Sequence, residues 1–132
     1  MFRAEYGNPK WINEVLARHP RLRIYLMHAG YPFFEDTIAL MGVYPNVYAD
    51  LSRINWSIPR PAFHDYLKRL IDAGLESRLM FGSDGVGLPE AIGLAVEGIE
   101  SAVFLTEQQR EDIFYNNAAR FLRLEQSGTP SR

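Results

Sequence analysis

Three apolar runs in the sequence each end in polar side chains that could take part in catalysis. His28 ends the first run, Asp50 and Ser52 end the second, and Ser83 and Asp84 end the third. Imidazole and carboxylate groups can bind a divalent metal ion or move a proton to and from a water molecule. In parallel α/β sheets, active sites form at the carboxyl ends of the strands. The shared position of these side chains therefore predicts one functional site, with His28 and Asp84 as its main candidates.

Each of these residues also has a purely structural explanation when it is taken alone. His28 could be hydrogen-bonded within the fold, Asp84 could cap the helix that follows it, and Asp50 could bond to its own loop. Arg53 follows the second run and could clamp an anionic group of a substrate, or it could simply be solvated. The common location of the residues favours the functional interpretation.

The three runs have the composition of buried parallel strands. They cover residues 22–28, 47–51 and 78–82 and have nearly continuous apolar centres. Between and after the runs, apolar residues recur at helical spacing, and a capping box is expected at Thr106 and Gln109. The expected helical faces lie at 11–16, 34–41, 63–71, 92–103 and 113–122. This alternation predicts an α/β fold in which parallel strands are joined by right-handed crossovers.

Length, composition and charge exclude several classes of protein. The chain has 132 residues, of which 47% are hydrophobic, so we expect one globular domain over 1–132 with a frayed tail at 125–132. Lys and Arg number 14 and Asp and Glu number 16, and this net charge of −2 argues against binding to nucleic acid or to an anionic membrane. The sequence has no cysteine and no long apolar run, so we expect a cytoplasmic protein without thiolate metal sites.

Four segments of the chain resemble the amidohydrolase-related family of metal-dependent TIM-barrel hydrolases and their decarboxylase relatives. They are YLMHAGYPF (25–33), PNVYADLS (45–52), RLMFGSD (78–84) and IFYNNAARFL (113–122). Their order, their spacing and the helices between them agree with the family pattern over roughly residues 6–124. The resemblance implies that the three expected strands are the last three of an eight-stranded barrel, so the fold class is α/β with parallel βα units from an incomplete barrel.

The resemblance also implies roles for two residues. His28 matches a histidine that binds metal or acts as an acid or base and contacts the substrate. Asp84 matches a carboxylate on the metal side that takes a proton from the attacking water. The implied cofactor is a divalent metal, with zinc as the first choice, because such an ion turns bound water into a nucleophile near neutral pH. The implied reaction is hydrolysis of a C–N or C–O bond in a small molecule, or nonoxidative decarboxylation of an aromatic or enoic acid.

The sequence departs from the family pattern in its metal ligands. The first strand of family members carries two histidines separated by one residue, whereas this chain has only His19, His28 and His64. We expect His19 and His64 to be solvated. Asp84 is followed by Gly85 rather than by the aromatic–proline pair that is common in the family. We therefore expect the C-terminal portion of such an enzyme, which by itself binds a divalent metal weakly because a catalytic zinc takes three protein ligands.

Two other interpretations remain open at this point. The chain could be a non-catalytic fragment or interaction module, or a small complete α/β domain with an unrelated binding site. In an isolated three-stranded sheet, the two outer strands near 22–28 and 78–83 would expose unpaired backbone groups and apolar faces. We therefore expect the chain to self-associate or to pair with the missing N-terminal part of a barrel.

Overall fold

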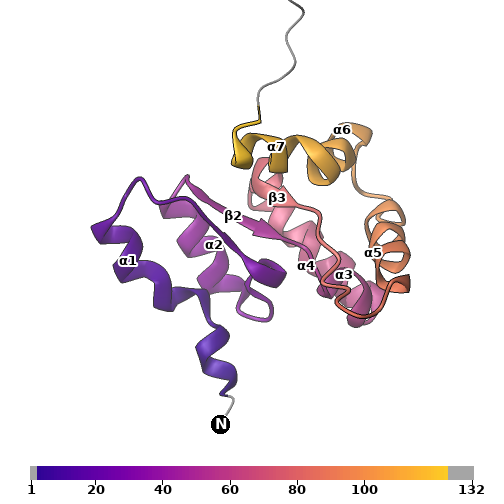
Figure 1. Ribbon diagram of the computed structural model, residues 1–132, viewed down its shortest axis with the longest axis horizontal. Coiled ribbons are helices and arrows are strands. Elements are labelled where there is room, and N and C mark those ends of the chain that lie inside the picture. Colours follow the sequence, from indigo (N-terminus) through magenta and orange to yellow (C-terminus); the bar gives the residue numbers. More distant parts are fainter. Residues whose placement is uncertain (1–2, 125–132) are drawn as a thin grey trace, which may run out of the picture.

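The computed structural model describes residues 3–124, so the expected tail at 125–132 lies outside the described residues. The fold is an open sheet of three parallel strands with helices around it (Figure 1). The strands are β1 (Ile24–Leu26), β2 (Val47–Asp50) and β3 (Leu79–Met80). They lie side by side in chain order, which confirms the predicted parallel α/β arrangement. No helix within the described part is long and apolar enough to cross a membrane.

Both outer strands are shorter than the sequence predicted. β1 ends at Leu26 because the chain enters a 3-10 turn, Met27–Gly30, in which His28 has a φ of 56° and Ala29 a φ of 48°. Such positive φ angles are incompatible with a strand. β3 begins only at Leu79 because the preceding residues form a short 3-10 helix, Glu76–Arg78. His28 therefore lies in a tight turn beyond β1 and not in the strand itself.

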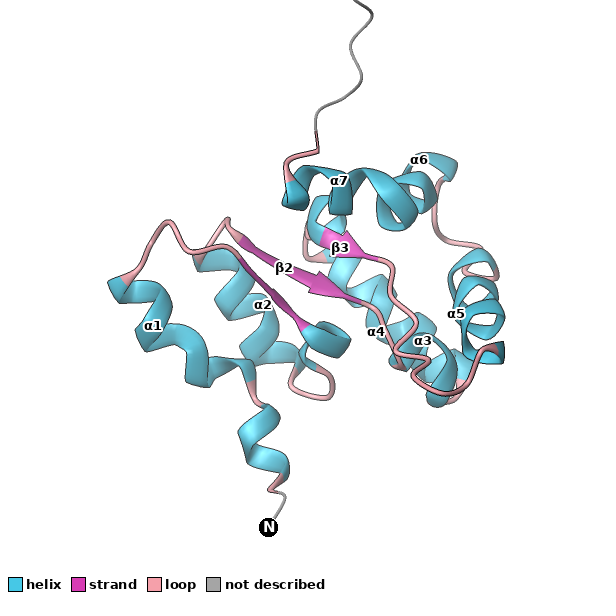
Figure 2. Ribbon diagram, viewed as in Figure 1, coloured by secondary structure: helices cyan, strands magenta, loops and turns pink. Residues whose placement is uncertain are grey.

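Seven α-helices occur in the described part of the chain (Figure 2). They are α1 (Asn13–Arg18), α2 (Phe34–Val43), α3 (Ile54–Ser57), α4 (Arg60–Asp72), α5 (Glu90–Glu100), α6 (Glu107–Glu111) and α7 (Asn117–Leu122). The predicted capping box is present, because the Gln109 N–H donates to Thr106 Oγ1 at 3.1 Å and the Thr106 N–H donates to Gln109 Oε1 at 3.0 Å. A π-helical turn, Asp112–Asn116, joins α6 to α7. The short α3 was not predicted.

The hydrophobic core lies between one face of the sheet and helices α2 and α4. Val47 and Ala49 of β2 belong to this face and are fully buried, as are Leu67 and Leu70 of α4. Helix α7 covers the opposite face, where Tyr48 lies. The Phe121 ring contacts the Tyr48 ring with a centroid separation of 5.1 Å. The sheet is therefore covered on both sides over β2, as buried parallel strands require.

The outer edge of β3 is covered by the segment that follows α6. The Phe81 N–H donates to the Ile113 carbonyl at 2.7 Å, and Asn117 Nδ2 donates to the carbonyls of Leu79 and Glu76 at 2.8 Å each. Buried backbone groups need partners, and here a helical turn supplies them in place of another strand. The expectation of two open edges is therefore wrong for β3. Within residues 3–124, β1 pairs only with β2, so its outer edge is open.

Asn117→Ala should lower the free energy of unfolding by about 1–3 kcal/mol, because the change leaves two carbonyls without their buried donor. Asn117 is 0% exposed. Chemical denaturation of the purified chain measures the effect. Asn116→Ala is the matched control, since among residues 3–124 Asn116 Nδ2 bonds only to Asp112 one turn earlier, and the expected loss is below about 1 kcal/mol. Equal losses in the two variants would contradict the role of Asn117 at the β3 edge.

Candidate functional site

His28 is held in place by its own backbone and by the turn around it. The His28 N–H donates to Asp50 Oδ1 at 3.0 Å. The next carbonyl, that of Ala29, accepts a hydrogen bond of 2.8 Å from the Tyr66 hydroxyl of α4. Gly30 completes the turn with a φ of +68°, and a Cβ there would lie 2.1 Å from Thr37 Oγ1. Only glycine fits this position, because a side chain would be strained at this φ and would collide with Thr37.

Asp50 connects the turn after β1 to the turn after β2. Besides the His28 N–H, its Oδ1 accepts hydrogen bonds from the Ser52 N–H at 2.9 Å and from Ser52 Oγ at 2.5 Å. The side chain is buried, and hydrogen bonds to an ionised acceptor are stronger than neutral ones. The expectation that Asp50 could bond to its own loop is confirmed, and the same carboxylate also fixes the neighbouring turn.

The position of Ser52 determines which nitrogen of His28 carries the proton. His28 Nδ1 lies 3.0 Å from the Ser52 carbonyl oxygen and 3.0 Å from Ser52 Oγ. A carbonyl oxygen can only accept, and the Ser52 hydroxyl already donates to Asp50, so Nδ1 must be the donor. In the neutral imidazole, Nε2 then carries the free lone pair. This tautomer suits a general base or a metal ligand.

Asp84 lies opposite this lone pair. Its Oδ2 is 3.9 Å from His28 Nε2, and the two side chains are 27% and 28% exposed, respectively. The distance is too long for a direct hydrogen bond, so the two groups can act together on one atom placed between them. Asp84 does not cap the following helix, because α5 begins at Glu90 after Pro89. The structure therefore brings His28 and Asp84 to one edge of the sheet, while their roles remain predictions.

The other predicted residues differ in their surroundings. Arg53 follows Ser52 at the same edge with an exposed side chain, and its role as an anion clamp remains a prediction. His19 is exposed, as expected. The expected solvation of His64 is wrong, because its Nε2 lies 3.1 Å from the Gly98 carbonyl and its ring contacts Phe104 between α4 and α5. The amphipathic pattern of α4 could not reveal this contact, since Gly98 lies 34 residues further along the chain.

A cavity of about 400 Å³ adjoins the site on the α7 side of the sheet. Asp50, Ser52 and Asp84 contribute polar groups to its lining, and the apolar lining includes Met80 and Phe121. A small molecule with an apolar body and a polar reacting group would fit this distribution.

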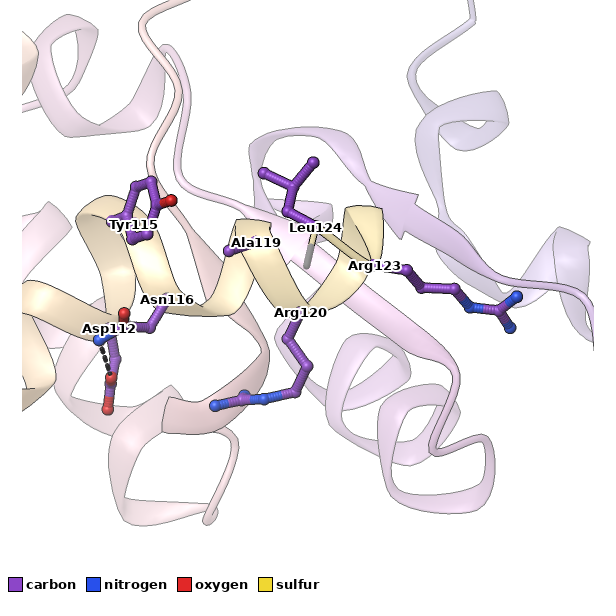
Figure 3. Close-up of a pocket in the computed structure, with 7 residues that line it drawn as sticks. All are labelled: Asp112, Tyr115, Asn116, Ala119, Arg120, Arg123 and Leu124. Atoms are coloured by element: carbon purple, nitrogen blue, oxygen red, sulfur yellow. Dashed lines mark hydrogen bonds between the residues drawn. The ribbon is translucent and has the colours of Figure 1, made fainter. Parts of the chain in front are cut away.

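A larger cavity, of about 560 Å³, lies along α7 and contains neither His28 nor Asp84 (Figure 3). The side chains of Arg120 and Arg123, which line it, point in different directions. Arg120 is also engaged with the Ser77 carbonyl and with Asn117 Oδ1. This second cavity therefore presents no convergent set of reactive groups.

The donor set for a metal ion is only partial. His28 has the arrangement of a metal-binding histidine, because its other nitrogen donates to a backbone carbonyl. Asp84 could share an ion with it, but a catalytic zinc takes three protein ligands. Among residues 3–124, no group of three or more His, Cys, Asp and Glu side chains could hold a metal together. The described residues by themselves do not fit a resident metal.

Comparison with known proteins identifies the family. A sequence model of the amidohydrolase family matches residues 1–124. This chain belongs to the amidohydrolase family. The amidohydrolase chain is 27% identical to protein fluG of Emericella nidulans over 133 aligned positions, which are 89% of this chain and 15% of fluG.

A solved structure shows where these strands occur in a larger fold. The amidohydrolase chain superposes on an uncharacterized TIM-barrel protein from Bordetella bronchiseptica with a TM-score of 0.71 and 22% identity. The match covers 92% of this chain and 41% of the barrel protein. The chain thus has the fold of part of a TIM barrel, which confirms the predicted fold class. It spans less than half the length of each of these two proteins.

Nitrogen-15 NMR at about pH 9, where imidazoles are neutral, should show opposite tautomers for the two structured histidines. His28 should be protonated on Nδ1, because that atom faces the Ser52 carbonyl. His64 should be protonated on Nε2, because that atom faces the Gly98 carbonyl. The exposed His19 serves as the reference for a free imidazole. An Nε2–H tautomer at His28 would contradict the assigned site geometry.

Tyr66 should make the chain less stable in strong alkali. Burial raises the pKa of Tyr66 from 10.0 to about 12. Between these pH values the folded chain keeps a proton that the unfolded chain loses. The contribution of Tyr66 to the free energy of unfolding is therefore fully present below pH 10 and falls as the pH rises toward 12. We expect a loss of about 1–3 kcal/mol over this interval, measured by urea denaturation. Tyr66→Phe should remove this slope, whereas Tyr115→Phe, at an exposed position, should retain it.

Proposed function

We propose that this chain contributes His28 and Asp84 to the active site of a metal-dependent amidohydrolase. The reaction would be hydrolysis of a C–N or C–O bond in a small molecule, or nonoxidative decarboxylation of a carboxylic acid. The observation that carries the proposal is the geometry of the pair. The Nε2 lone pair of His28 faces the Asp84 carboxylate across 3.9 Å, and a backbone carbonyl fixes the tautomer from behind. A base and a proton carrier at this separation can act on one water or substrate atom.

The two side chains have complementary parts in such a reaction. In hydrolysis, the Asp84 carboxylate accepts the proton of the attacking water as the new C–O bond forms, and the same proton then passes to the leaving nitrogen or oxygen. His28 Nε2 orients the water or the substrate through its lone pair. In decarboxylation, one of these two groups first takes a proton from solvent, and as the C–C bond to the carboxylate breaks and CO2 leaves, that proton passes to the carbon left behind. Ser52 keeps the imidazole ring from rotating in either reaction.

The surroundings of the pair support the proposed class of substrate, and the family chemistry supplies the proposed cofactor. The cavity beside Asp84 suits the apolar body of a small molecule, and Arg53 at the same edge would clamp an anionic group. A divalent metal, with zinc as the first choice, supplies water activation in this chemistry. His28 and Asp84 offer two ligands, so at least one more must come from residues outside 3–124.

A non-catalytic role is the second candidate. It is favoured by the absence of a three-ligand cluster among the described residues. On this alternative, the chain keeps the edge geometry as a structural feature and does not act on a substrate.

Zinc should bind weakly and at one place. In the isolated chain, zinc added in an NMR titration should first shift the His28 ring and Asp84 signals, and dialysis should leave a substoichiometric amount by elemental analysis. Asp84→Asn should weaken this binding by about tenfold or more, because it removes a charged ligand. Asp72→Asn is the control, since that exposed carboxylate bonds only to Lys68 of the same helix. Zinc that binds first at His19 or His64 would contradict the proposal.

The same variants distinguish catalysis from a structural role. In a longer polypeptide that contains this chain and turns over a substrate, Asp84→Asn should lower kcat by about 10²–10⁴-fold. Asp72→Asn should leave kcat unchanged. Near-normal turnover by Asp84→Asn would favour the non-catalytic alternative.

A further inference from the structure

The short helix α3 contacts the backbone just before Asp84. Trp56 Nε1 donates to the Ser83 carbonyl at 2.6 Å, and Asn55 Nδ2 donates to the Gly82 carbonyl at 3.0 Å. Two consecutive carbonyls at the end of β3 are thus held by two consecutive side chains of one helix. Among the described residues, the other hydrogen bond to these carbonyls is a longer one from the backbone, in which the Arg53 N–H donates to the Ser83 carbonyl at 3.4 Å.

Asp84 needs such support because its backbone is in an unfavourable conformation. Its φ is 49°, in the left-handed region, which Asp adopts more readily than most L-residues but which is still uncommon. The segment is only partly buried, and α5 does not begin until Glu90. The gap of 3.9 Å to His28 shows that no direct bond from the imidazole holds the carboxylate. Its position therefore depends on the preceding peptide unit.

The Ser83 carbonyl belongs to that peptide unit. This planar unit contains the Ser83 carbonyl and the Asp84 nitrogen, so a hydrogen bond to the carbonyl oxygen fixes the orientation of the plane. The φ of Asp84 is the rotation about the N–Cα bond that leaves this plane. On the other side, Gly82 brings the chain close to the turn after β2, where a Cβ on Gly82 would lie 2.9 Å from Ser52 Cβ. The end of β3 is consequently confined between Ser52 and the indole of Trp56.

We propose that Trp56 is a positioning residue for Asp84. Its indole N–H holds the peptide unit before Asp84 in the orientation that turns the carboxylate toward His28. The segment from Ser52 to Trp56 then orients both side chains of the pair, because Ser52 fixes the imidazole of His28 and Trp56 fixes the carboxylate of Asp84. The functional importance of this control rests on the proposed function of the pair, whereas the geometry is tested without metal or substrate.

Asn55 is a less informative position for a test. It is 1% exposed, and a Cβ on Gly98 would lie 2.2 Å from the Asn55 carbonyl oxygen, so any substitution also disturbs the packing of α3 on α5. Trp56 is half-buried, and its N–H can be removed while a ring remains.

The experiment compares Trp56→Phe with Trp11→Phe by NMR of the isotope-labelled chain at about pH 9, where imidazoles are neutral. Trp11 is the matched control, because its indole N–H also donates to a backbone carbonyl, that of Glu5 at 2.8 Å, but far from the site in the sequence. The first readout is the strong intraresidue HN–Hα cross-peak of Asp84 that marks a positive φ. The second is the shift of the His28 ring signals that Asp84→Asn causes.

Trp56→Phe should abolish the Asp84 cross-peak and should reduce the effect of Asp84→Asn on the His28 ring by at least about twofold, because the two changes act on one interaction. Trp11→Phe should leave both readouts unchanged. A purely structural role would lower the melting temperature without uncoupling His28 from Asp84. Retention of the coupling between His28 and Asp84 in Trp56→Phe would overturn the proposal.

If Trp56→Phe does not fold, benzothienylalanine at position 56 in the Trp11→Phe chain replaces only the indole N–H by sulfur. This replacement keeps the ring size, so the Asp84 cross-peak and the coupling between His28 and Asp84 test the proposal in the same way. Near-normal turnover by Asp84→Asn in the longer polypeptide would refute the proposed function and would leave this result intact, so the two proposals fail separately.

Discussion

The hydrogen bonds to the Asp50 carboxylate are the interaction on which the rest of the site depends. One oxygen atom accepts the His28 N–H, the Ser52 N–H and the Ser52 hydroxyl. It thereby joins the turn after β1 to the turn after β2. Because the group is buried, loss of these partners would leave an uncompensated charge, which costs far more than the bonds contribute in water. The imidazole tautomer and the direction of Nε2 follow from this one anchor through Ser52.

Backbone strain is concentrated at the carboxyl ends of the strands, where the site lies. His28, Ala29, Arg53 and Asp84 all have positive φ angles, and all lie in the turns that follow the strands. Such conformations cost of order 1–3 kcal/mol each and persist only where the surrounding structure determines them. Here the buried strand β2 provides the rigid support, because all four of its residues are buried. The turns at the carboxyl ends of the strands therefore lower the stability of the fold while they hold these side chains in fixed orientations.

The two outer edges of the sheet have different properties. The β3 edge is closed by Asn117 and by the π-helical turn before it, whereas within residues 3–124 the outer edge of β1 has no paired strand. The partial donor set of His28 and Asp84 lies at the carboxyl ends of these same strands. The open edge of β1 is thus the side on which a further strand could bring the ligands that the described residues do not supply.

The sequence by itself determined the class of fold and the meeting of His28 with Asp84. Apolar runs alternating with helical periodicity specify parallel strands, and parallel strands place their carboxyl ends at one edge, so no distance was needed for that prediction. Only the tertiary structure decided what surrounds the pair. The donor on His28, the anchoring by Asp50, the closure of β3 by Asn117 and the contact of His64 with Gly98 depend on residues 22 to 41 positions apart. Local patterns do not encode which of many polar groups will meet across such separations, because those meetings follow from how the helices pack on the sheet.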